Sequence, residues 1–162
     1  MAIAMMSWML AIPVLGMMTG LRAMTPIAVV CWFAYLGDLP VDGTWAQWMQ
    51  KLWVAILFSV LAAAECVGDK LPKTPNRISP LPLLARLVFG GLVGSVAATA
   101  LNEPGIEGVL LGVMGAGLGA FAGFMLRREL VEKIGCADWP VAVGEDLLTL
   151  VWALLAMHVI TG

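Results

Sequence analysis

Seven ionisable residues, in three parts of the chain, are of the types that bind ions and small polar solutes. They are Arg22, Glu65, Asp69, Lys70, Arg77, Glu145 and Asp146. Carboxylates bind protons and cations, whereas guanidinium and ammonium groups bind anions. All seven border long apolar segments, where an ionised side chain is costly unless it has a partner, water or a function. We therefore predict that these residues line a polar site for an ion or a small solute.

The densest of these parts runs from Glu65 to Arg77 and reads ECVGDKLPKTPNR. Glu65 stands about 13 residues into an apolar helix, about 20 Å from one membrane face and about 10 Å below the other. Asp69 follows one helical turn later, on the same face if the helix continues. Two carboxylates this close raise each other's proton affinity unless a cation lies between them. Lys70, Arg77 and Arg22 are the candidates for that cation.

Glu145 and Asp146 begin the last apolar segment and approach the same end of the molecule. An arrangement of six helices brings them to the depth of Glu65 and Arg22, which predicts a shared pocket. A structural role is the alternative. In that case the two acids complement the N-terminal dipole of their helix, and Glu65 pairs with Arg22 to hold the bundle. The sequence leaves both interpretations open.

The composition indicates the environment of this site. Of 162 residues, 61% are hydrophobic and 12% are charged, and the mean hydropathy is +0.95. These values predict an integral membrane protein with one domain over residues 1–162, because no polar stretch is long enough for a linker. The net charge of −2 provides no basic surface for nucleic acid. No nucleotide, metalloprotease or Ser-His-Asp motif is present, and no cofactor is implied.

Six continuous apolar segments predict an all-α fold, a polytopic transmembrane helical bundle. A bilayer core of about 30 Å needs about 20 helical residues, and a membrane β-barrel would instead show alternation of period two. The segments are about Ala2–Met18, Pro26–Leu36, Leu52–Val67, Pro80–Leu101, Gly105–Leu126 and Pro140–Ile160.

The second segment, Pro26–Leu36, is too short for a full span. It is either a short spanning helix that includes Arg22 to Thr25, or a re-entrant half helix of the kind that borders transporter sites. The residues that follow, Asp38 to Gln50, place tryptophans at helical spacing and predict a short amphipathic helix in the membrane interface.

Three of the helix starts share a small polar residue followed by a proline. We predict that the polar residue is the N-cap in each case and that the proline lies in the first turn. The pairs are Thr25 with Pro26, Ser79 with Pro80, and Asp138 with Pro140.

Glycines recur at four-residue intervals in the fourth and fifth segments. The series are Gly90 and Gly94, Gly108 and Gly112, and Gly115, Gly119 and Gly123. Small residues at this spacing let helix backbones approach closely, which drives association in lipid. We predict that the fourth and fifth helices form a tight antiparallel pair, or that the fifth self-associates in a homo-oligomer.

The cations predict the orientation of the chain. With six spans, Lys51 lies at one end and all other lysines and arginines lie at the opposite end. Short loops rich in lysine and arginine stay in the cytoplasm, so both termini are predicted to face outward. A re-entrant second segment would instead move the N-terminus inward.

Three short motifs, GLRAMTP, E…GDKLP and GEDLL, resemble an uncharacterised family of small bacterial multi-pass membrane proteins, domain of unknown function 4126. The likeness covers nearly the whole chain and implies a location in the inner membrane, but no activity. KTPNR, residues 73–77, is more basic than the family pattern, so the likeness does not extend to Arg77. The positions that match are Arg22, Pro26, Glu65, Asp69, Lys70, Pro72, Glu145 and Asp146.

Three functions fit these observations. The leading one is a transporter or channel in the lipid bilayer, in which the acids bind a cation or proton and Arg22 balances charge or contacts an anion. The second is an enzyme acting on lipid head groups, with Mg²⁺ held by carboxylates and the lipid anion held by Arg22 and Arg77. The third is a scaffold whose glycine strip binds a partner protein.

Overall fold

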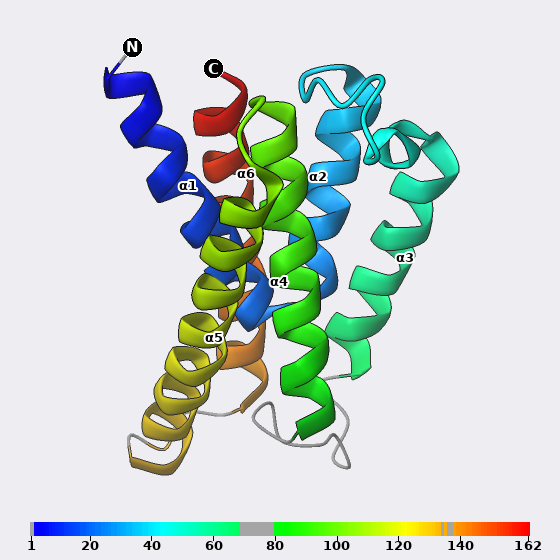
Figure 1. Cartoon of the computed structure of the whole chain (residues 1–162). Coiled ribbons are helices and arrows are strands. Elements are labelled where there is room, and N and C mark those ends of the chain that lie inside the picture. The colour runs from blue at the N-terminus through cyan, green and yellow to red at the C-terminus, as the bar shows by residue number, and fades with distance from the viewer. Residues whose placement is uncertain (1, 69–79, 134, 136–137) are drawn as a thin grey trace.

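The fold, seen here in a computed structural model, is a bundle of six helices (Figure 1). The structure describes residues 2–68, 80–133, 135 and 138–162, and this part of the chain contains no strand. The helices are α1 (Ala2–Leu21), α2 (Met24–Leu36), α3 (Leu52–Gly68), α4 (Pro80–Ala100), α5 (Gly105–Arg128) and α6 (Asp138–Thr161).

The all-α fold and the six predicted segments are confirmed. Three helices are long and apolar enough to cross a membrane, namely Pro80–Ala100, Gly105–Val131 and Trp139–Thr161. The apolar helices before them are shorter, and α2 has only 13 residues. The length and apolar character of these helices identify the chain as a membrane protein.

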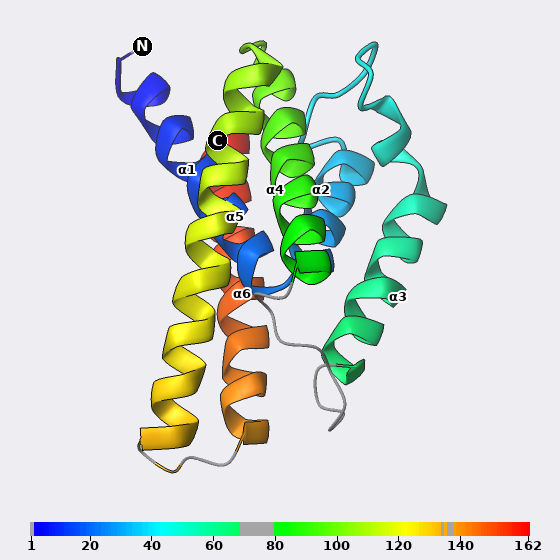
Figure 2. The same cartoon turned by 60° about the horizontal axis from the view of Figure 1, so that its bottom comes forward.

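The helices alternate in direction along the bundle. Both termini lie at the same end as the α2–α3 and α4–α5 connections, at the top of Figure 1. α5 packs along α1 and α4, while α6 packs against α1 and α2. α3 packs mainly against α2 and stands at the side of the bundle in both views (Figure 2).

Glycines bring α4 and α5 into backbone contact, as predicted. A Cβ atom on Gly94 would lie 3.1 Å from the Cα of Gly112, and a Cβ on Gly108 would overlap the carbonyl oxygen of Gly94. The predicted antiparallel pair therefore forms within one chain. The same strip of α5 also receives α1, a contact that the glycine spacing did not predict. A Cβ on Gly16 would lie 2.9 Å from the Cα of Gly112.

Local signals at the helix starts were only partly correct. α2 begins at Met24, before the predicted cap Thr25, and no side-chain hydrogen bond from Ala23 caps it. α4 begins at Pro80 as predicted, but its expected cap Ser79 lies outside the described residues. Asp138 is the first residue of α6 rather than a residue before it.

The predicted interfacial helix between α2 and α3 is wrong in extent. Only Gln47–Gln50 is helical, as one 3₁₀ turn, labelled η1. Met49 points into the protein and is fully buried, whereas Trp45 is exposed. This segment is therefore a loop with one turn, anchored by a buried side chain.

The close helix contacts predict opposite effects for two glycine-to-alanine changes. In Gly119→Ala the new methyl group overlaps the backbone of Met17, so overpacking should destabilise the protein by about 1–3 kcal/mol. In Gly144→Ala the methyl group meets nothing within 4 Å, and removing a helical glycine should leave stability unchanged or slightly raised. Thermal unfolding in detergent measures both. Equal unfolding temperatures would contradict the packing described here.

Candidate functional site

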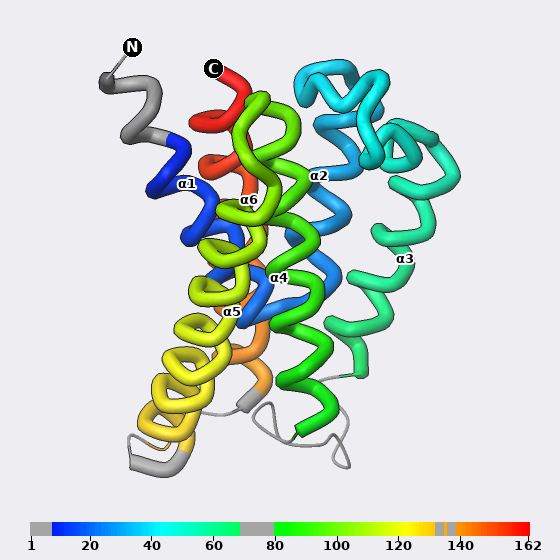
Figure 3. The backbone as a smooth tube through the Cα atoms, in the orientation of Figure 1, coloured from blue at the N-terminus to red at the C-terminus, as the bar shows by residue number. Residues whose placement is uncertain are grey.

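A break between two helices lies inside the bundle. α1 ends at Leu21 and α2 begins at Met24, so only two residues separate them. A Cβ atom on Gly20 would lie 2.9 Å from the Cα of Gly119. α5 continues from there to Arg128, about 13 Å further along its axis (Figure 3). The ends of α1 and α2 are thus well inside the end of α5.

Helix ends in such a place carry backbone groups without partners in the helix itself. The carbonyl end of α1 is bound by Arg86 of α4, which is 5% exposed. Its guanidinium Nη1 donates to the carbonyl oxygens of Gly20 and Leu21, the latter at 2.9 Å. A cation at this position also complements the negative end of the α1 dipole.

The amide end of α2 is bound by a carboxylate from another helix. Glu65 of α3 accepts hydrogen bonds from the backbone N–H groups of Ala23, at 2.9 Å, and Met24, at 2.8 Å. This is the role of an N-cap, performed in trans where the sequence had suggested Thr25. The Glu65 carboxylate also lies 3.9 Å from the Arg86 guanidinium.

Arg22, in the break itself, is fully buried and pairs with Asp146 of α6. Its Nη2 lies 2.6 Å from Asp146 Oδ1, so the two side chains form a close ion pair. The structural alternative considered from the sequence, a pair between Glu65 and Arg22, is therefore not the arrangement found.

Each ion pair of the network joins opposite charges, Arg22 with Asp146 and Arg86 with Glu65. Burial of an ion costs several kcal/mol, and a partner with good geometry offsets that cost. A separate pair lies beside the network, where Glu145 is 3.8 Å from Arg127 of α5.

Thr149 extends the polar region one turn deeper along α6. It follows Asp146 by three residues, so both lie on the same face of the helix. Its side chain is fully buried, and its hydroxyl has no hydrogen-bond partner among the described residues. A buried hydroxyl without a hydrogen-bond partner in the protein is costly, so Thr149 is an unusual residue at this position.

Four of the seven predicted residues lie in this region: Arg22, Glu65, Glu145 and Asp146. Asp69, Lys70 and Arg77 lie outside the described residues. The role of all seven as ligand-binding residues stays a prediction.

The sequence analysis missed Arg86 and Arg127 as members of the site. Arg86 interrupts an otherwise apolar helix at its seventh residue, and an arginine so placed normally has a partner in the protein interior. That signal was available. Arg127 gave no comparable signal, because it stands with Arg128 at a helix end, where cations are common.

Glu65 and Glu145 have different partners, since Glu65 binds the start of α2 and Glu145 lies beside Arg127. Among the described residues no group of three or more histidine, cysteine, aspartate or glutamate side chains is placed to hold a metal ion. The enzyme with Mg²⁺ held by carboxylates, the second function considered from the sequence, stays a hypothesis.

Residues 9–159 match the family described as Domain of unknown function (DUF4126). The chain belongs to this family. The match confirms the resemblance noted in the sequence and covers every member of the charged network. No curated protein and no solved structure matches the chain. DUF4126 is a family of unknown function, so the family match assigns no activity to the protein. The charged network is the feature from which a function can be inferred.

The buried pair predicts a specific pattern of stability. Asp146→Leu leaves the Arg22 guanidinium buried without its carboxylate, which should destabilise the protein by about 3–5 kcal/mol. Arg22→Met combined with Asp146→Leu should recover most of that loss, because an apolar pair replaces an ion pair. Denaturation of the wild type, Asp146→Leu and the double variant in detergent measures the free energy of unfolding of each protein. A double variant less stable than Asp146→Leu alone would contradict the pairing.

Proposed function

We propose that this protein is a small membrane transporter for an ion or small polar solute, and that the break between α1 and α2 is its binding centre. The observation that carries the proposal is the Glu65 carboxylate. It reaches from α3 to bind the amide end of α2 beside a fully buried arginine. The sequence alone suggested the same function from the clustered acids.

The depth of the network supports this function. Asp146 stands eight residues into α6 and Arg86 six residues into α4, which is about 12 Å and about 9 Å from the starts of these helices. Ionisable groups at such depth in membrane helices are rare and mark ion and solute pathways. A broken helix beside them offers carbonyl groups for cations and N–H groups for anions, as in known transporter sites.

The contacts at the break can be exchanged without unfolding the bundle. Glu65 comes from α3, which packs mainly against α2 and stands apart from the rest of the bundle. When Glu65 takes up a proton, its carboxyl group becomes a weaker acceptor and releases the N–H groups of Ala23 and Met24. Those groups, with Arg22 nearby, then bind the solute. Proton binding and solute binding are thereby coupled.

The direction of access follows from the cations. Arg22, Arg86, Arg127 and Arg128 belong to the half of the bundle where α3 ends and α4 begins, and Lys51 lies at the other end. By the positive-inside rule we place the charged end in the cytoplasm and the protein in the inner membrane. The polar centre then opens toward the cytoplasm.

Proton flux into liposomes tests this function. Purified protein is reconstituted with a pH-sensitive dye inside, and ions and small polar solutes are added one at a time. We expect at least one to drive proton movement, and Glu65→Gln, which cannot take up the proton, to reduce the flux at least tenfold. Glu107→Gln is the matched control, because Glu107 is exposed at the opposite end.

The proposal fails if the folded wild-type protein moves no solute, or if Glu65→Gln transports as well as wild type. Unfolding temperature and elution from size exclusion show whether each variant is folded.

One observation favours a second function, a scaffold that binds a partner protein. The two ion pairs of the network join side chains of opposite charge across the break, and holding the break together is the role that the network has in a scaffold. If the protein is a scaffold, the double variant Arg22→Met/Asp146→Leu should replace the wild-type protein in cells. If the protein is a transporter, the double variant should fail to do so. The glycine strip of α5 is occupied by α1 and α4, so a partner would need another surface.

A further inference from the structure

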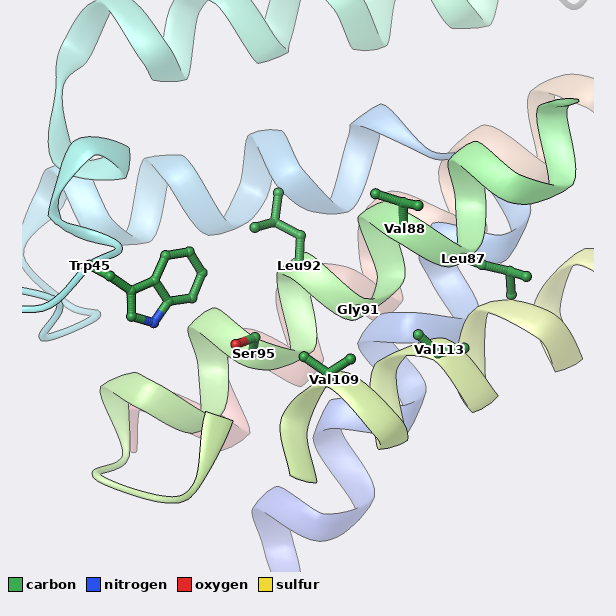
Figure 4. Close-up of a pocket in the computed structure, with 8 residues that line it drawn as sticks. All are labelled: Trp45, Leu87, Val88, Gly91, Leu92, Ser95, Val109 and Val113. Carbon is green, nitrogen blue, oxygen red and sulfur yellow. The ribbon is translucent and has the colours of Figure 1, made fainter. Parts of the chain in front are cut away.

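A groove of 480 Å³ lies along the seam between α4 and α5, in the half of the bundle that contains the termini. Its walls are apolar, with Leu87, Val88 and Leu92 from α4 and Val109 and Val113 from α5. Figure 4 shows the side chains of α4 on one side and those of α5 on the other, with the indole of Trp45 at one end. Both helices are long and apolar enough to span the membrane, so hydrocarbon is the environment that we expect at the open side of the groove.

Gly91 forms part of the groove wall. A Cβ atom there would approach a side-chain methyl of Val113 to 3.1 Å and one of Val109 to 3.4 Å. The absence of a side chain therefore keeps the seam open between the two valines. From Leu87 to Ser95 the groove follows about 12 Å of helix, a length suited to a linear apolar chain.

A second cavity, of 620 Å³, adjoins the groove at Trp45, which lines both. Its other walls are Thr44, Gln47, Gln50 and Lys51, with the ring of Trp48. These side chains offer hydroxyl, amide and ammonium groups and no carboxylate. Lys51 is the only lysine or arginine at this end in the part of the chain that the structure describes.

Trp45 is held where the two cavities meet. Its indole N–H donates to the hydroxyl of Thr99 at 3.2 Å, and Thr99 in turn donates to the carbonyl oxygen of Ser95 at 2.8 Å. A tryptophan fixed to the end of a membrane helix marks the level of the lipid head groups. The apolar groove therefore lies on the hydrocarbon side of this level and the polar cavity on the water side.

We propose that the groove and the cavity together bind one anionic glycerophospholipid. An acyl chain lies along α4 and α5, and the phosphate lies beside Lys51 with hydrogen bonds from the glutamine amides. Four acidic residues, Asp38, Asp42, Glu103 and Glu107, also lie at this end but line neither cavity. The site is separate from the network at the α1–α2 break and rests on different residues.

The apolar groove alone would not select a lipid, because acyl chains gain little by exchanging one apolar neighbour for another. Selectivity comes from the head group. One basic residue near the membrane surface contributes about fivefold to the binding of an anionic lipid. The structure thus predicts that phosphatidylglycerol binds about fivefold more tightly than phosphatidylcholine, because Lys51 contributes one positive charge.

Native mass spectrometry of the whole protein, titrated with either lipid, tests the proposal. We expect phosphatidylglycerol to bind about fivefold more tightly than phosphatidylcholine, and Lys51→Gln to abolish that difference while Lys51→Arg retains it. Val88→Trp fills the groove and should weaken both lipids at least tenfold. Its control is Val151→Trp on α6, at a side chain of similar exposure, 51% against 58% for Val88.

Both tryptophan changes are at exposed positions, so the fold should persist. Ser95→Leu places a smaller side chain in the groove, and it should also weaken the binding of both lipids, as Val88→Trp does. The proposal is overturned if Val88→Trp and Ser95→Leu bind lipid like wild type, or if Lys51→Gln keeps the preference. It is also overturned if the protein is a dimer that Val88→Trp dissociates, since a second copy would then occupy the groove.

Discussion

The rest of this structure depends on a helix break inside a membrane bundle. Backbone groups at the end of α1 and the start of α2 need partners, because hydrocarbon supplies none. Arg86 and Glu65 provide them, from α4 and α3. Arg22, the residue of the break, in turn needs a counter-charge, which α6 supplies through Asp146. One local interruption of helix therefore ties together five of the six helices.

Glycine packing decides where that interruption lies. α1 approaches α5 closely at Gly16 and Gly20, and this contact holds the end of α1 well short of the end of α5. Bulkier residues would separate the two backbones, and the carbonyl groups of Gly20 and Leu21 would leave the reach of Arg86. Apolar contact in one part of the bundle thus positions polar chemistry in another. α3, which supplies Glu65, packs mainly against α2 in the described part of the chain.

The sequence predicted the number and limits of the helices well, because the length of an apolar run follows from the thickness of a bilayer. It also predicted the α4–α5 pair and the family. It did not predict the partners of the charges. Pairing of Arg22 with Asp146 depends on the depth of the break, and that depth depends on α1 contacting α5. Short-range cap signals at Thr25 gave the wrong answer for the same reason, since a distant carboxylate provides the cap.

The central claim is that water and solute reach the polar centre. Thr149→Cys, in protein whose native cysteines are replaced by serine, tests it with a small charged thiol reagent applied to membrane vesicles of either orientation. Thr149 is buried one turn beyond Asp146, and Ala153, on the same face and fully buried, is the control position. We predict that Thr149→Cys reacts from the side of the charged end and that Ala153→Cys does not. No reaction at Thr149→Cys from either side would show a sealed network and contradict the account.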